Sequence, residues 1–231
     1  DEVARLHGQR NRYYVGGNIE SLNLPIHSDF KQIRNTPPEI RQQFRKLGWK
    51  RVVGFQTRQP IHRPQFELTI QAMKKAKANL LMLPIAGIPR PGDFDHYTRM
   101  RCYQKVSGHY PPDTYMLNLL PLSTRMAGPR DAVLHMIIGK NFGCTHFVIG
   151  HNHATPGKDS CGNPFYDTPQ VRELAREAGE EINIEPVFFE EMVYLPFEDE
   201  FKLASEVKEG QETLSFTNDD IRDRVRKGKH I

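Results

Sequence analysis

A polar stretch between two apolar segments holds the side chains of clearest chemical potential in this chain. The tetrapeptide 56–59 (Gln-Thr-Arg-Gln) follows a short apolar run, and His62 precedes an amphipathic segment that ends in lysines. Where a strand passes into a helix in this way, backbone N–H groups and the positive end of the helix dipole favour an anion. Arg58 adds a planar fork of donors, and protonated His62 adds another. The stretch therefore predicts an anion site, with an ordinary polar loop as the alternative.

Three further loops carry residues of the same kind. The loop 150–158 (Gly-His-Asn-His-Ala-Thr-Pro-Gly-Lys) combines two histidines with two glycines, which permit close approach of the backbone to a ligand. The loop 87–93 contains glycine, arginine and aspartate, and the loop 125–130 opens a helix at Gly-Pro, where proline suits the first turn. Together the loops predict an anion or nucleotide site. The sequence has no Gly-x-x-x-x-Gly-Lys-Ser/Thr, which argues against a Walker-type kinase.

A metal site is the alternative interpretation of the paired histidines His151 and His153. They have no nearby third ligand with a recognisable spacing, so we expect no protein-bound zinc. The three cysteines, Cys102, Cys144 and Cys161, are odd in number and lack Cys-x-x-Cys spacing. That argues against a disulfide framework or a cysteine zinc site, and it fits a reducing cytoplasm.

The elements that must position these loops alternate along the chain. Apolar runs predict five strands, and the amphipathic stretches between them predict helices. Strands that alternate with helices at this spacing are typical of an α/β protein with a mostly parallel sheet. Such a sheet binds its ligand at the carboxyl ends of its strands, around the switch point. The predicted strands are 52–55, 80–83, 116–120, 145–149 and 186–189, and the predicted helices lie near 38–47, 64–77, 96–107, 129–142, 168–180 and 218–228.

Composition places the chain among ordinary soluble α/β proteins. Its 231 residues, 38% hydrophobic and 26% charged, suffice for one domain with a small appendage. No run approaches the ~20 apolar residues of a membrane span, and the first residues lack a signal-peptide core. We therefore expect a cytoplasmic protein without a membrane partner. The net charge of +4 is modest, and no exposed strand interleaves aromatic and basic residues, so nucleic acid is the weakest option.

Several of these segments, in the same order, resemble the ATP sulfurylase (sulfate adenylyltransferase) family over nearly the whole chain. The motifs that carry the resemblance are 14–17 (Tyr-Val-Gly-Gly), 56–63 (Gln-Thr-Arg-Gln-Pro-Ile-His-Arg), 99–103 (Arg-Met-Arg-Cys-Tyr), 110–113 (Tyr-Pro-Pro-Asp), 125–130 (Arg-Met-Ala-Gly-Pro-Arg), 140–147 (Lys-Asn-Phe-Gly-Cys-Thr-His-Phe) and 150–154 (Gly-His-Asn-His-Ala). The resemblance implies a Rossmann-like nucleotidyltransferase that forms adenylyl sulfate and pyrophosphate from MgATP and sulfate, or catalyses the reverse.

The resemblance also implies roles for individual residues. Sulfate would contact Gln56, Arg58 and the backbone of Ala154, and Thr57, Arg58 and Gln59 fall on the catalytic positions. Met192 falls where the family contacts adenine. The full set implied for ATP binding is Gln56, Thr57, Arg58, Gln59, His62, Gln65, Gly150, His151, Asn152, His153 and Met192.

Domain organisation and partners follow from the same resemblance. Residues 1–45 would lead in from an amino-terminal PUA-like domain that the sequence does not contain, so we expect a fragment of a longer protein. Residues 46–195 would form the catalytic domain and 196–231 a small α/β carboxyl-terminal subdomain. Mg²⁺ would accompany ATP, the chain would form homo-oligomers, and an adenylyl-sulfate kinase would be fused to it or associated with it.

Four residues depart from the family motifs within the site. Gln59 stands in place of asparagine, Gln65 in place of histidine, His151 in place of arginine and Thr155 in place of glycine. Each lost charge-assisted contact would cost about 1.5–3 kcal/mol. The substitutions therefore leave two alternatives to the sulfate enzyme: adenylyl transfer to a different oxyanion, or a catalytically weak nucleotide-binding regulatory protein.

Overall fold

A computed structural model describes residues 26–87, 94–151, 153–190 and 192–215, together with residues 8, 13, 16–18, 20, 23, 220, 223, 224 and 226–228. Most of the loop 87–93 lies outside the described residues, and of the predicted helix near 218–228 only residues 220, 223, 224 and 226–228 are described. Within them, helices and strands alternate as the sequence predicts. The elements are η1 (Lys31–Ile33), α2 (Pro37–Leu47), β1 (Val52–Thr57), α3 (Arg63–Ala76), β2 (Asn79–Pro84), α4 (His96–Ser107), β3 (Tyr115–Leu117), α5 (Pro129–Phe142), β4 (His146–Ile149), α6 (Thr168–Ile182), β5 (Glu185–Phe188), β6 (Met192–Leu195), β7 (Glu200–Leu203) and η2 (Ala204–Glu206).

The first five strands form one parallel sheet in the order β3-β2-β1-β4-β5. The chain winds outward from β1 through β2 to β3, and then returns to place β4 on the other side of β1. The switch point of this doubly wound sheet therefore lies between β1 and β4, where such sheets bind ligands. This architecture confirms the α/β, mostly parallel fold predicted from the sequence.

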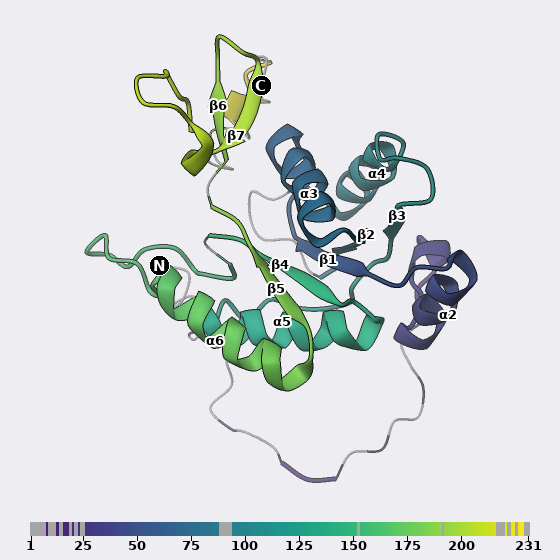
Figure 1. Cartoon of the computed structure of the whole chain (residues 1–231). Coiled ribbons are helices and arrows are strands. Elements are labelled where there is room, and N and C mark those ends of the chain that lie inside the picture. Colours follow the sequence, from purple (N-terminus) through teal and green to yellow (C-terminus); the bar gives the residue numbers. More distant parts are fainter. Residues whose placement is uncertain are drawn as a thin grey trace.

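Helices cover both faces of the sheet (Figure 1). Helices α3 and α4 pack on one face, and α2, α5 and α6 pack on the other. Neighbouring residues of β1 serve opposite faces: Val52 packs with the α2/α5/α6 layer, and Val53 with the α3/α4 layer. Strands buried on both faces read as continuous apolar runs, which is why the sequence identified them.

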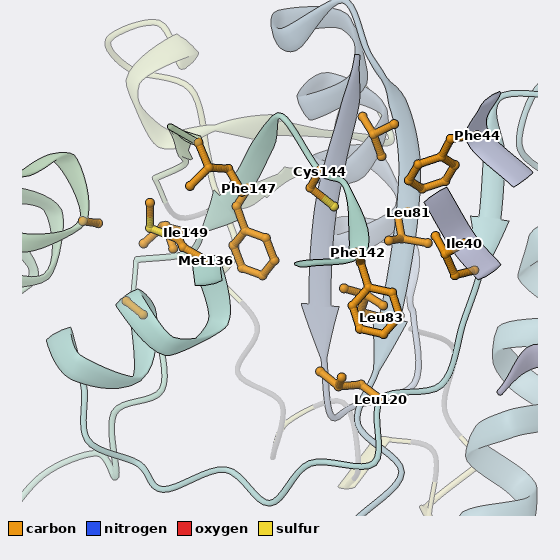
Figure 2. Close-up of a cluster of buried hydrophobic side chains, with 14 of the residues drawn as sticks. Ile40, Phe44, Leu81, Leu83, Leu120, Met136, Phe142, Cys144, Phe147 and Ile149 are labelled. Carbon is orange, nitrogen blue, oxygen red and sulfur yellow. The ribbon is translucent and has the colours of Figure 1, made fainter. Parts of the chain in front are cut away.

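Phe147 belongs to the cluster of buried hydrophobic side chains between the sheet and the α5 layer (Figure 2), and two glycines make room for its ring. A Cβ atom on Gly54 of β1 would lie 2.8 Å from the Phe147 ring, and one on Gly139 of α5 would lie 2.6 Å from it. The ring of Phe147 thus fills the space that the two missing side chains leave. This contact allows the last turns of α5 to pack close to the sheet.

The buried face of α5 differs from the predicted one. The sequence pattern indicated a shared face of Ala132, Val133, Met136, Ile137 and Phe142. In the structure Ile137 is 39% exposed, whereas the polar residues Asp131 and His135 are each only 2% exposed. Ala132, Met136 and Phe142 are buried as predicted. The pattern was wrong at Ile137, because it placed apolar residues inward by type alone, while the polar residues Asp131 and His135 are buried.

Strand β1 is two residues longer than predicted, which moves part of the polar tetrapeptide into the sheet. Gln56 and Thr57 pair in register with Leu83 and Pro84 of β2. Strand β3 is shorter than predicted and ends at Leu117. The next residue, Asn118, is fully buried and hydrogen-bonds through its side chain to the backbone of Asn35, before α2. Because Gln56 belongs to β1, its backbone is held by pairing with β2 and does not lie in a loop.

An antiparallel hairpin of β6 and β7 follows the sheet, and the sequence analysis did not predict these strands. Arg63, the first residue of α3, holds the hairpin through an ion pair of 2.7 Å with Asp199 and lies over the Phe201 ring. Strand β6 ends at residue 195 and β7 begins after it. The hairpin therefore spans the boundary that we predict at residue 195 between the catalytic domain and the carboxyl-terminal subdomain, and that division stays a prediction. None of the helices in the described part of the chain is long and apolar enough to cross a membrane.

Candidate functional site

A polar pocket of about 380 Å³ opens at the carboxyl edge of the sheet, beside the switch point between β1 and β4. It collects the end of β1, the start of α3, the loop before α5 and the loop after β4. None of the described residues that line it is an acid. The lining residues are Phe55, Gln56, Thr57, Arg58, Gln59, Gln65, Ile85, Thr124, Met126, His135, Val148, Gly150, His153, Ala154 and Thr155.

A tight turn at the end of β1 presents Arg58. The Thr57 hydroxyl accepts a hydrogen bond of 3.2 Å from the backbone N–H of Gln59, and the hydroxyl itself lies 3.1 Å from the Gln59 carbonyl oxygen. Threonine side chains commonly hold turns in this way. Thr57 is 8% exposed. Its side chain therefore serves mainly to fix the backbone conformation on either side of Arg58.

Side chains of helix α4 hydrogen-bond to the backbone of the same turn. Arg99, only 1% exposed, donates from Nη1 to the carbonyl oxygens of Arg58 and Ile85, each at 3.2 Å. The Tyr103 hydroxyl donates to the Gln59 carbonyl oxygen at 2.6 Å. Sequence reasoning noted Arg99 and Tyr103 only within the family resemblance and gave them no role. The available signal was an arginine on the apolar face of a helix, beside Met100.

Gln56 belongs to a chain of side chains that crosses three elements. Its Nε2 lies 3.1 Å from Nε2 of His135 on α5, and Nδ1 of His135 lies 2.9 Å from Nε2 of His153 after β4. Burial lowers the pKa of His135 from 6.5 to about 4. The pKa of His153 is lowered to about 3, mainly by burial and also by the neighbouring His135, while Asp131 acts to raise it. Both imidazoles are therefore neutral at pH 7.

The loop before α5 is organised by Asp131 and by contact with the loop after β4. The Asp131 carboxylate accepts hydrogen bonds from the backbone N–H groups of Arg125 and Ala127 at 3.1 and 3.4 Å. Gly128 donates its N–H to the Ala154 carbonyl oxygen at 3.1 Å. Gly128 has φ +50°, and a Cβ there would lie 2.4 Å from the Tyr166 ring, so only glycine fits. Ala154 also has a left-handed φ of 50°, which turns the backbone of this loop at the pocket wall.

The amino-terminal end of α3 completes the pocket. His62 is the N-cap residue, and its carbonyl oxygen accepts the first helical hydrogen bond, from Phe66 at 3.0 Å. Gln65 in the first turn lines the pocket, and its Oε1 is buried without a hydrogen-bond partner among the described residues. A helix start beside a pocket favours an anionic ligand through its free N–H groups and its dipole.

The structure brings most of the predicted site residues together. Gln56, Thr57, Arg58, Gln59, Gln65, Gly150, His153 and Ala154 all line the pocket. His62 lies at the adjacent helix start, and Met192 begins β6. His151 lines a second cleft of about 740 Å³ instead, together with Arg172 and Arg176 of α6. Asn152 is outside the described residues.

The described residues contain no group of three or more His, Cys, Asp or Glu side chains that could hold a metal ion. His153 pairs with His135 in place of a ligand set, and His151 lines the other cleft. The donor groups of the pocket suit an anion. A divalent cation there would depend on ligand oxygens, as Mg²⁺ commonly does when it binds with a nucleotide.

Comparison with known proteins agrees with this fold. A family model described as ATP-sulfurylase matches residues 31–231. The sulfate adenylyltransferase of Mycosarcoma maydis is 44% identical over 229 residues, which are 99% of this chain and 40% of that protein. The enzyme of the same name from Aspergillus terreus is 46% identical over 219 residues, 95% of this chain and 39% of that protein. Among solved structures, the hexameric APS kinase from Thiobacillus denitrificans matches with a TM-score of 0.73 and 29% identity, over 90% of this chain and 38% of that one.

The fold and pocket define a doubly wound α/β protein with a polar pocket at the carboxyl edge of its sheet. The family match then makes the assignment specific: the chain belongs to the ATP-sulfurylase family. It spans about two fifths of the length of the curated relatives it matches.

Proposed function

We propose that this chain carries the catalytic site of a sulfate adenylyltransferase, which converts MgATP and sulfate into adenylyl sulfate and pyrophosphate or catalyses the reverse. The observation that supports this most strongly is the pocket at the switch point, where Gln56 and Arg58 meet the loop around Ala154. The named relatives and the family model support the same assignment.

The chemistry of the pocket suits two polyanions. In the forward reaction an oxygen of sulfate bonds to the α-phosphorus of ATP while the bond from that phosphorus to pyrophosphate breaks. Sulfate is a poor nucleophile, and its attack brings two anions together. The protein must therefore act by alignment and charge neutralisation, without a nucleophile of its own. A pocket whose described lining contains Arg58 and amide donors but no acid meets that requirement.

We assign the residues as follows. Arg58 grips sulfate with its guanidinium fork, and Gln56 and the backbone of Ala154 complete the sulfate subsite. Thr57 and Gln59 hold the turn that presents Arg58 to both substrates. ATP lies across the start of α3 and the loop after β4, and the adenine reaches β6. The ATP contacts in this proposal are Gln56, Thr57, Arg58, Gln59, His62, Gln65, Gly150, Asn152, His153 and Met192. His151 lines the second cleft, so its proposed contact requires that the nucleotide extend into that cleft.

The proposal extends to the whole protein of which this chain is a part. The matched relatives are more than twice as long as the matched region, which supports further domains in the whole protein. We propose that one of them is a PUA-like domain before the catalytic one. We also propose a homo-oligomer and an associated adenylyl-sulfate kinase. The name of the solved relative, a hexameric APS kinase, supports both ideas.

The test is ATP formation from adenylyl sulfate, pyrophosphate and Mg²⁺ by the full-length protein. The variant Arg58→Ala should abolish ATP formation, whereas Arg45→Ala, which removes an exposed arginine of α2, serves as the matched control and should retain it. A folded protein that binds adenylyl sulfate without forming ATP would refute the enzyme and favour the regulatory alternative. Absence of binding as well would favour a different acceptor oxyanion.

A further inference from the structure

Gln56 is held at the pocket wall by one described side-chain contact, to His135. Its other amide atom, Oε1, is buried and has no hydrogen-bond partner among the described residues. We propose that His135 is a positioning residue, which, together with His153, fixes the amide of Gln56 so that an N–H faces the acceptor anion. This inference rests on the proposed function, because it concerns the residue that we place on sulfate.

The donor and acceptor roles along the chain follow from the atoms involved. A side-chain amide nitrogen can only donate, so Nε2 of His135 must accept from Gln56. A neutral ring with an accepting Nε2 carries its proton on Nδ1. That N–H donates to Nε2 of His153 across 2.9 Å, which leaves the proton of His153 on Nδ1. One tautomer in each ring satisfies both contacts.

Burial keeps the arrangement in this single state. His135 is 2% exposed, so an imidazolium there would lose its hydration. Besides Gln56, His153 faces the ring from the loop after β4, and Asp131 lies one turn earlier on α5, with Oδ1 at 3.9 Å from Nε2. An imidazolium at His135 would carry a proton on Nε2 and could no longer accept from Gln56. Neutral His135 is therefore a requirement of the contact.

The orientation of the amide matters because sulfate offers only acceptors. While one N–H of Gln56 is held by His135, the other stays available to an oxyanion. Without His135 the amide has no described side-chain anchor and can turn Oε1 towards the pocket. An amide oxygen beside an anionic oxygen is repulsive, and neither atom supplies a hydrogen. His135 thus acts on the anion through Gln56, without touching the anion.

Two substitutions separate the halves of the chain. In His135→Gln the side-chain oxygen can take the place of Nε2 and still accept from Gln56. In His135→Asn the shorter amide lies near Nδ1, so it can still donate to His153 but no longer reaches Gln56. We expect His135→Asn to raise the KM for sulfate about tenfold, the loss of roughly one hydrogen bond. His135→Gln should change that KM by less than about threefold. Equal effects of the two variants, or the reverse order, would overturn the proposal.

A double-mutant cycle with Gln56→Ala tests whether the effect passes through Gln56. Once Gln56 is removed, His135→Asn should have no further effect on the KM for sulfate. Additive effects of the two substitutions would contradict the proposal. Urea denaturation of each variant identifies the fraction of folded protein, and every comparison is made between folded samples.

A final measurement is independent of turnover. Long-range ¹⁵N–¹H NMR spectra of the histidine rings at pH 7 should show both His135 and His153 neutral with the proton on Nδ1. A proton on Nε2 of His135 would overturn the inference. If the wild-type protein forms no ATP, the proposed function fails, and titration of adenylyl sulfate into wild type and His135→Asn still tests the positioning role: weaker binding by the variant supports it, and equal binding refutes it.

Discussion

Burial of His135 should make the stability of this protein depend on pH in a measurable way. The pKa of the imidazole falls from 6.5 to about 4 on folding. Between these values the unfolded chain binds a proton on His135 and the folded chain does not. The free energy of unfolding must therefore decrease as the pH falls from 6.5 towards 4. The stability associated with neutral His135 is fully present only above pH 6.5.

The magnitude follows from the two pKa values. Integrated from pH 7 to pH 5, the difference in proton binding lowers the free energy of unfolding by about 2 kcal/mol. The variant His135→Gln has no imidazole at this position and loses the contribution. The difference in stability between wild type and variant should therefore shrink by about 2 kcal/mol between pH 7 and pH 5.

Urea denaturation followed by circular dichroism, at both pH values, measures that difference. His27→Gln, which removes an exposed histidine before η1, controls for the loss of an imidazole as such. A difference that stays constant with pH would refute the reasoning. A difference that grows at pH 5 would show that attraction between a charged His135 and Asp131, 3.9 Å away, outweighs the cost of burial.

Three further substitutions test the framework of the site. Arg58→Ala should reduce ATP formation at least a hundredfold without moving the urea midpoint, and a kinetically normal variant would refute the role of this side chain. Arg99→Met should remove the hydrogen bonds from Arg99 to the carbonyls of Arg58 and Ile85, and an unpaired carbonyl costs roughly 1–3 kcal/mol. Urea denaturation should therefore show a less stable protein, which should also form ATP slowly. Stability equal to wild type would contradict this account. Gly54→Ala places a Cβ 2.8 Å from the Phe147 ring and should cost about 1–3 kcal/mol through overpacking, whereas a neutral result in the same assay would mean that the ring moves aside freely.

The local pattern of the sequence was sufficient for the framework of the fold. Strands such as β2 are buried on both faces, with Leu80 and Leu81 fully enclosed from opposite sides, and this produces an uninterrupted apolar run. Helix ends were marked equally well: Pro129 begins α5, and Gly143, with φ +95°, ends it. These signals are read within a few residues, so no tertiary information was needed to find them.

The β6–β7 hairpin shows where local pattern was insufficient. Its strands are four residues each and pair with one another, and Tyr194 of β6 also forms a bridge with Leu214. Their position depends on Arg63, which binds Asp199 from the start of α3. A contact between residues so far apart in the sequence leaves no local periodicity, so the hairpin could not be predicted in the same way as the main sheet.

The candidate site, too, could be predicted only in part from the local sequence, and the rest required the tertiary structure. The residue types of 56–59 and 150–154, and the rule that parallel strands carry ligands at their carboxyl ends, were enough to predict an anion site from the sequence alone. Only the tertiary structure decided that His151 faces a different cleft, that Arg99 supports the turn at Arg58, and that His135 links Gln56 to His153. The physical reason is that these roles depend on burial and on hydrogen bonds between elements. Both arise when α4 and α5 pack against the sheet, and neither is encoded in the spacing of neighbouring residues.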